Sequence, residues 1–142
     1  MARTTDHVID MLAALEVFAG LSAKQLKQVR ETGKLEHISP GVEIVAEGSK
    51  GRRLFLVLEG DADVTIGGRR VNTIGPGACF GEISALDGRP RAATVTATSH
   101  MRLLSIADFN LKALLRADPE FAISMLKALS GMVRGRSTVV TH

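Results

Sequence analysis

The feature that most constrains the fold is the stretch of residues 35–106, in which short apolar runs alternate with glycine. Runs rich in β-branched and aliphatic residues occur at 43–46, 54–58, 61–66, 94–98 and 101–106. Turn residues separate them, among them Gly48, Gly60, the pair Gly67 and Gly68, and the triplet at 75–77. Many short strands with turn residues between them are typical of a sandwich or a barrel. The sequence therefore predicts a β-sheet body of one of these two kinds.

Two helices are expected before this stretch, over residues 7–33. The first carries an apolar stripe at the spacing i, i+3, i+4 and i+7, formed by Val8, Met11, Leu12 and Leu15. The second begins near Ser22, which forms a capping-box pattern with Gln25, and Gly33 is placed to end it.

Two further helices are expected after the stretch, over about residues 107–135. Ser105 and Asp108 form a second capping-box pattern ahead of residues 109–116. Asp118 then provides an N-cap, with proline at the first helical position. The helix over 121–134 is apolar on more than one side, so it needs two partners. The barrel is one partner, and a ligand or the second subunit of a homodimer is the other.

Length and composition limit the class of protein. With 142 residues, of which 45% are hydrophobic, the chain is expected to be a single domain over 1–142. The 18 basic and 15 acidic residues give a net charge of +3, which does not favour a dedicated nucleic-acid binder. Cys79 is the single cysteine, which excludes an internal disulfide and a cysteine-built metal site. No apolar run approaches the ~20 residues of a membrane span, so we expect a soluble cytoplasmic protein.

The chemistry is concentrated in residues 80–97, which read F-G-E-I-S-A-L-D-G-R-P-R-A-A-T-V-T-A. Gly81 opens a segment that can form a helical turn, whose free N–H groups make an anion site. Arg91 follows between a proline and two alanines, and its planar guanidinium matches two oxygens of a phosphate. Glu82 has a carboxylate that only accepts hydrogen bonds, which suits sugar hydroxyls. The pattern indicates a nucleotide with a ribose and one phosphate.

This stretch resembles the phosphate-binding cassette of the cyclic nucleotide-binding domain family. That family includes kinase regulatory subunits, cyclic-nucleotide-gated channels and bacterial catabolite activator proteins. The upstream residues Ile44, Val45, Gly48, Gly51 and Gly60, with the run 54–57, resemble the family's other pattern. The resemblance covers about residues 17–134. It implies an α+β fold: an antiparallel β-roll (a double-stranded jelly roll) with N-terminal helices, a short cassette helix and two C-terminal helices.

The resemblance also implies a role for each matching residue. Arg91 would pair with the cyclic phosphate, and Glu82 would accept from the ribose 2′-hydroxyl. Backbone N–H groups of the cassette would complete the phosphate cradle, those of Gly81, Glu82, Ile83 and Ala92. Val64 and Ile44 would line the base. The last helix would act as a lid over the base, with Met132 or Arg134 as its cap.

The resemblance also implies that the residue at position 92 affects the selectivity between cAMP and cGMP. Family members that prefer cGMP carry a threonine there, whose hydroxyl bonds the guanine amino group, and Ala92 has no such group. We therefore expect cAMP as the ligand, with cGMP as the alternative. Ser49, Arg52 and Ala85 depart from the residues usual in the family, which bears on loop stiffness and pocket packing.

Three functions compete at this point. The first is a non-catalytic sensor that moves its C-terminal helix on binding and acts on an effector protein the sequence does not name. The second is a regulatory fragment or degenerate family member whose effector part, a DNA-binding domain, a channel or an enzyme, is absent from this chain. The third is a metal-dependent enzyme on a β-roll, which the scattered histidines disfavour because a metal site needs several ligands that converge. We expect no bound metal and no catalysis.

Overall fold

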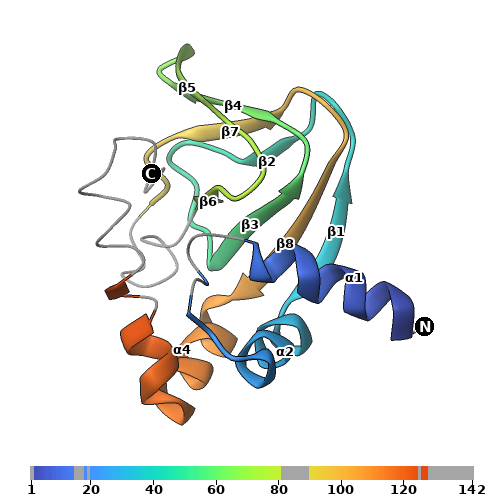
Figure 1. Ribbon diagram of the computed structural model, residues 1–142. Helices are drawn as coiled ribbons and strands as arrows, with labels where there is room; N and C mark the ends of the chain where they lie inside the picture. The colour runs from blue at the N-terminus through green and yellow to red at the C-terminus, as the bar shows by residue number, and fades with distance from the viewer. Residues whose placement is uncertain (1, 15–17, 19, 81–89, 125, 128–142) are drawn as a thin grey trace.

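Two antiparallel four-stranded sheets face each other as a roll in the computed structural model, which describes residues 2–14, 18, 20–80, 90–124 and 126–127 (Figure 1). In spatial order, the first sheet consists of β1 (Lys34–Ile38), β8 (Met101–Ala107), β3 (Arg53–Glu59) and β6 (Cys79–Phe80). The second consists of β2 (Glu43–Val45), β7 (Thr94–Ala97), β4 (Ala62–Ile66) and β5 (Arg69–Ile74). The α+β fold with an antiparallel β-roll is confirmed.

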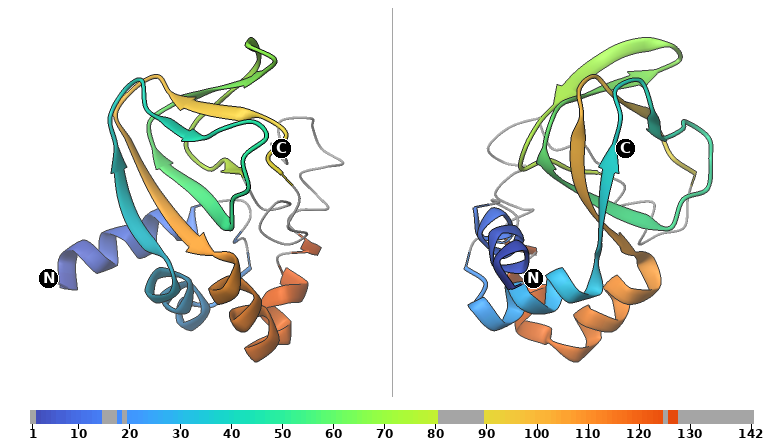
Figure 2. Two further views of the ribbon diagram at one scale, coloured as in Figure 1. Left: turned by 180° about the vertical axis from the view of Figure 1, so that it is seen from behind. Right: turned by 90° about the vertical axis from the view of Figure 1, so that its right-hand side faces the viewer.

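The helices gather at one end of the roll. They are α1 (Ala2–Ala13), α2 (Ala23–Thr32), α4 (Asp108–Ala117) and a helical stretch over 119–124 and 126–127. Figure 2 shows them beneath the first sheet from two further sides, with the β4–β5 hairpin projecting at the opposite end. The helices therefore cover one face of the first sheet and leave its other face to the roll interior.

Strand β3 connects the two parts of the core. Its five central residues are all buried, because alternate side chains point to opposite faces of the sheet and both faces are covered. Leu54, Leu56 and Leu58 pack with the helices, whereas Phe55 and Val57 pack in the roll interior. The uninterrupted apolar run 54–58 is thus a strand buried on both faces.

Several expected helix ends are confirmed. The Ser22 hydroxyl accepts from Gln25 N–H at 3.1 Å, and Ser22 N–H donates to Gln25 Oε1 at 2.9 Å, which completes the capping box. Asp118 caps the last helix, because its Oδ1 accepts from Phe121 N–H at 3.1 Å. Its Oδ2 accepts from the Gln25 side chain at 3.1 Å. The hydrogen bond from Gln25, and to a smaller extent that from Phe121 N–H, lower the pKa of Asp118.

The second predicted capping box is wrong. Ser105 lies inside β8, where its hydroxyl donates to Glu36 and accepts from Arg53 Nη1. Helix α4 instead begins at Asp108, after Ala107, without a side-chain cap. The N-terminal helix also begins earlier than expected, at Ala2.

Candidate functional site

The backbone of Arg91 is held by the segment between β2 and β3. Arg91 N–H donates to the Ser49 carbonyl at 2.8 Å, and the Arg91 carbonyl accepts from Gly48 N–H at 2.7 Å. Gly48 has φ +81°, a conformation that glycine adopts without the strain of a Cβ. These two hydrogen bonds, one to Ser49 and one from Gly48, fix the backbone of Arg91 shortly before β7 begins.

The side chain of Arg91 is buried against the same segment. Only 3% of its surface is exposed. Its Nη2 donates to the Arg53 carbonyl at 3.1 Å, and its Cζ lies 5.9 Å from the centroid of the Phe55 ring. A Cβ added to Gly51 would lie 2.5 Å from the same Cζ, so the guanidinium packs directly on this glycine. Burying a cation is costly, and a fold that does so holds the charge in a defined place.

A cavity of about 650 Å³ opens beside Arg91. Its walls come from β2, the segment 49–53, Phe55, and the junction of β8 with α4 at Ala107 and Asp108. The volume lies in the range of small-molecule sites, roughly 300–1,000 Å³. Lys50, Arg52, Arg53 and Arg91 line it together with the acids Glu43 and Asp108, so basic side chains outnumber acidic ones.

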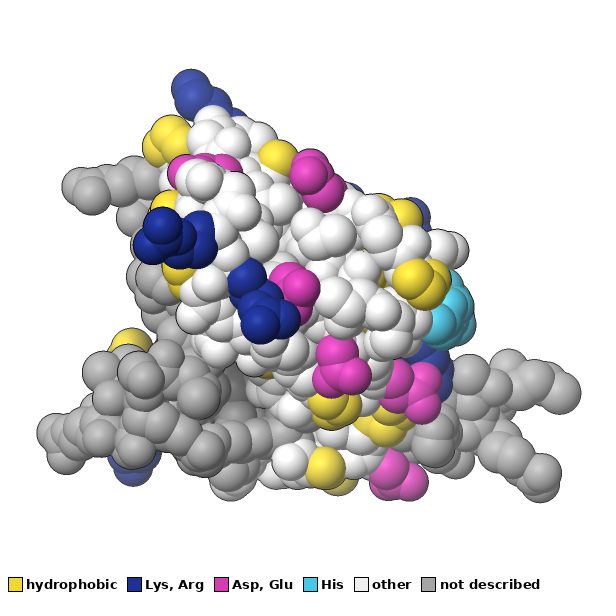
Figure 3. Space-filling model, turned by 90° about the horizontal axis from the view of Figure 1, so that it is seen from above, with side chains coloured by type: hydrophobic (Ala, Val, Ile, Leu, Met, Phe, Trp, Pro, Cys, Tyr) yellow, Lys and Arg dark blue, Asp and Glu magenta, His cyan; other side chains and the backbone are white. Residues whose placement is uncertain are grey.

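The end of the roll opposite the helices carries side chains of both charges. In the view from above, Lys and Arg side chains lie mainly on the left part of the visible face, and most Asp and Glu side chains lie toward its centre and right (Figure 3).

The two residues expected to line a base lie inside the roll. Val64 is fully buried, and Ile44 is partly buried. Both belong to the apolar cluster that contains Phe55, whose ring lies under the Arg91 guanidinium. Ile44 lines the cavity beside Arg91, whereas Val64 is not among the residues that line it and is connected to Arg91 only through the cluster that contains Phe55.

Ala92 is exposed, between the buried Arg91 and Ala93. The other predicted site residues lie outside the part of the chain that the structure describes. They are Gly81, Glu82, Ile83, Met132 and Arg134.

The sequence did not reveal three contributions to this site. The carbonyls of Ser49 and Arg53 bond Arg91, and the Phe55 ring lies beneath it. Backbone carbonyls carry no residue-type signature, so no pattern could have shown them. Phe55 was visible only as a core residue of the run 54–58.

The fold and the site define a class of protein: an antiparallel β-roll that holds a buried arginine beside a cavity of small-molecule size. The family model described as "Cyclic nucleotide-binding domain" matches residues 35–118, which contain strands β2 to β8, all but the first residue of β1, and all of α4. The chain belongs to the cyclic nucleotide-binding domain family.

Two curated relatives show the range of proteins in which similar chains occur. A cyclic nucleotide-gated potassium channel of Mesorhizobium japonicum is 32% identical over 112 residues, covering 79% of this chain and 31% of the channel. A cAMP-dependent protein kinase regulatory subunit of Eremothecium gossypii is 34% identical over 110 residues, covering 70% of this chain and 24% of the subunit. The chain thus spans a third or less of each relative's length.

A solved structure of another protein has the same fold. The regulatory domain of Toxoplasma gondii PKA, crystallised with cAMP, superposes with a TM-score of 0.71 at 29% identity. The superposition covers 80% of this chain and 45% of that one. In the described part of this chain, no helix has the length and apolar character needed to cross a membrane.

Proposed function

We propose that this chain is a non-catalytic cyclic nucleotide sensor that binds cAMP through Arg91 and closes its C-terminal helix over the bound base. The observation that carries the proposal is the buried, doubly fixed Arg91 beside a cavity of about 650 Å³. A guanidinium held in one orientation gives bidentate recognition of a phosphate at a small entropic cost.

The remaining roles follow the family resemblance. Glu82 accepts from the ribose 2′-hydroxyl, and backbone N–H groups of Gly81, Ile83 and Ala92 complete the phosphate cradle. Val64 and Ile44 contact the base, and the position of Ile44 in the cavity wall supports this role for Ile44. Met132 or Arg134 caps the base from the last helix.

Selectivity for cAMP rests on Ala92. A methyl group offers no hydrogen bond to a guanine amino group, so cGMP gains nothing at this position. One net hydrogen bond contributes about 1 kcal/mol, which corresponds to roughly a 5-fold difference in affinity. The Toxoplasma regulatory domain crystallised with cAMP supports the same ligand class.

A sensor of this kind passes the effect of ligand binding to an effector, which is a further domain or a separate protein. Because the chain spans 31% of the channel relative, one reading is that it acts as the regulatory unit of a larger assembly. The other is a sensor that acts on a separate protein or as a homodimer through its C-terminal helix. The two readings share the same ligand chemistry.

Calorimetric titration of cAMP and of cGMP into the wild-type chain tests the proposal. We expect saturable 1:1 binding of cAMP, tighter than that of cGMP. Chromatography of the nucleotide after prolonged incubation should recover intact cAMP. Binding of neither nucleotide would overturn the sensor function, tighter cGMP binding would overturn the selectivity, and enzyme-dependent appearance of AMP would overturn the non-catalytic role.

A further inference from the structure

An ion pair joins the segment between β2 and β3 to the start of α4. Arg52 Nη1 lies 3.1 Å from Asp108 Oδ2, and Asp108 N–H donates to the Arg52 carbonyl at 2.6 Å. The Asp108 side chain is only 12% exposed, whereas that of Arg52 is 76% exposed. One residue of the segment therefore bonds the first residue of α4 with both its side chain and its backbone.

The same segment, together with the first residue of β3, also makes hydrogen bonds to Arg91. Gly48 and Ser49 bond its backbone, and the Arg53 carbonyl bonds its Nη2. Gly51, directly before Arg52, packs on the guanidinium. Residues 48–53 thus contact Arg91 near both their ends and bond Asp108 at Arg52.

We infer that Arg52 and Asp108 are positioning residues for Arg91, an inference that rests on the proposed function. Their ion pair holds residues 48–53 in the shape that packs on the guanidinium, although neither side chain needs to touch the ligand. By reciprocity, ligand bound at Arg91 stabilises the same segment and with it the start of α4.

The ion pair also determines where the charge of Arg52 lies. Arg52 directly follows Gly51, which packs on the Arg91 guanidinium. Two cations that lie close together repel each other unless one of them is directed elsewhere. The pairing with Asp108 directs the Arg52 charge toward α4.

The variant Asp108→Ala separates positioning from simple electrostatics. Removing a negative charge from the wall of an anion site should tighten binding of an anionic ligand if only Coulomb forces act. If the pair positions Arg91, the same substitution weakens binding. A partly exposed ion pair of this kind supports a change of about 2- to 5-fold in Kd. The two accounts therefore predict opposite signs.

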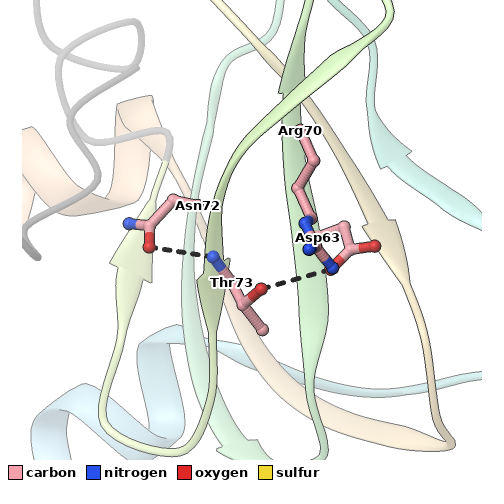
Figure 4. A network of polar contacts seen from close by, with 4 residues as sticks. All are labelled: Asp63, Arg70, Asn72 and Thr73. Carbon is pink, nitrogen blue, oxygen red and sulfur yellow. Dashed lines mark hydrogen bonds and ion pairs between the residues drawn. The ribbon is translucent and has the colours of Figure 1, made fainter.

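The experiment is calorimetric titration of cAMP into wild type, Asp108→Ala, Arg52→Gln and the double variant. Lys50→Gln is the matched charge control, because it removes a cation from the same segment and Lys50 is in no ion pair among the described residues. Arg70→Gln controls for loss of an ion pair elsewhere, since Arg70 lies 4.0 Å from Asp63 on the β4–β5 hairpin (Figure 4).

We expect both single variants to weaken cAMP binding about 2- to 5-fold, and the double variant to bind like either single one. Lys50→Gln should weaken binding less than Arg52→Gln, and Arg70→Gln should bind like wild type. Urea unfolding of each variant checks that the fold is retained. If Asp108→Ala does not fold, Arg52→Gln carries the test, and Arg52→Lys, which keeps the positive charge, serves as its rescue.

Three results would each overturn the inference while cAMP binding by wild type stands. The first is unchanged or tighter binding by Asp108→Ala, and the second is additive losses of affinity in the double variant. The third is an equal loss of affinity in Lys50→Gln and Arg52→Gln. A wild-type chain that binds no cyclic nucleotide removes the proposed function, and this inference falls with it.

Discussion

Gly51→Ala gives a sharp test of the packing around Arg91. A Cβ at position 51 would lie 2.5 Å from Arg91 Cζ, closer than real Cβ contacts allow, so the guanidinium must move. The backbone of Gly51 is not in the left-handed region, and alanine therefore adds no conformational strain there. The substitution should disturb the position of the charge and little else.

The expected effects on binding and on stability differ in size. The end of a long side chain can shift at small cost to the fold, and replacing glycine by alanine also reduces the entropy of the unfolded chain by about 0.4–1 kcal/mol. A hydrogen bond to a charged group contributes about 1.5–3 kcal/mol, and a displaced guanidinium loses such a contact with the phosphate. We therefore expect Kd for cAMP to rise about 10- to 150-fold, with the free energy of unfolding nearly unchanged.

The assay pairs calorimetric titration of cAMP with urea unfolding, and Gly41→Ala is its counterpart. Gly41 has φ +90° and an added Cβ there meets nothing within 4 Å. Gly41→Ala should therefore lower the free energy of unfolding by about 1–2 kcal/mol and leave cAMP affinity unchanged. Wild-type affinity in Gly51→Ala would refute the argument that this glycine sets the position of the guanidinium.

Three more predictions concern selectivity, packing and pH. Ala92→Thr should raise cGMP affinity relative to cAMP by about 5-fold in competition titration, and no change would contradict the role given to position 92. Phe121→Ala should lower the free energy of unfolding by about 3–5 kcal/mol, because Phe121 is 1% exposed and its ring lies 6.4 Å from that of Phe18. Phe109 is 77% exposed, so Phe109→Ala should lower the free energy of unfolding by less than about 0.5 kcal/mol in the same urea assay. Because hydrogen bonds lower the folded-state pKa of Asp118, its carboxylate stabilises the fold above the unfolded pKa, and this contribution is lost as pH falls through the lower folded value. Urea unfolding between about pH 5 and pH 2 should therefore show a smaller acid loss in Asp118→Asn than in wild type, and parallel curves would contradict this linkage.

The sequence predicted the strands that bury apolar side chains. The run 54–58 and the alternation at 61–66 are visible because burial on one or both faces leaves a pattern of apolar residues. Strand β5 carries Arg69, Arg70, Asn72 and Thr73 and is mostly exposed, so it has no apolar pattern to find. Strand β6 has two residues, too few for any periodicity.

Ser105 shows why a local motif can mislead. Its spacing from Asp108 matches a capping box, but its hydroxyl bonds Glu36, 69 residues away on the neighbouring strand β1. A local pattern cannot show which of two partners a hydroxyl takes when the sheet brings the second one close. The same limit applies to Arg91: its residue type and spacing indicated an anion site, while the carbonyls that hold it come from residues 49 and 53.

The central claim is that Arg91 binds the phosphate of a cyclic nucleotide, and calorimetric titration of cAMP into wild type and Arg91→Ala tests it most directly. Loss of the charged partner of a phosphate should cost about 2–5 kcal/mol, a rise of at least about 30-fold in Kd. Arg70→Ala, which removes a charge from the exposed β4–β5 hairpin, should bind like wild type. Equal affinities of wild type and a folded Arg91→Ala would contradict the account.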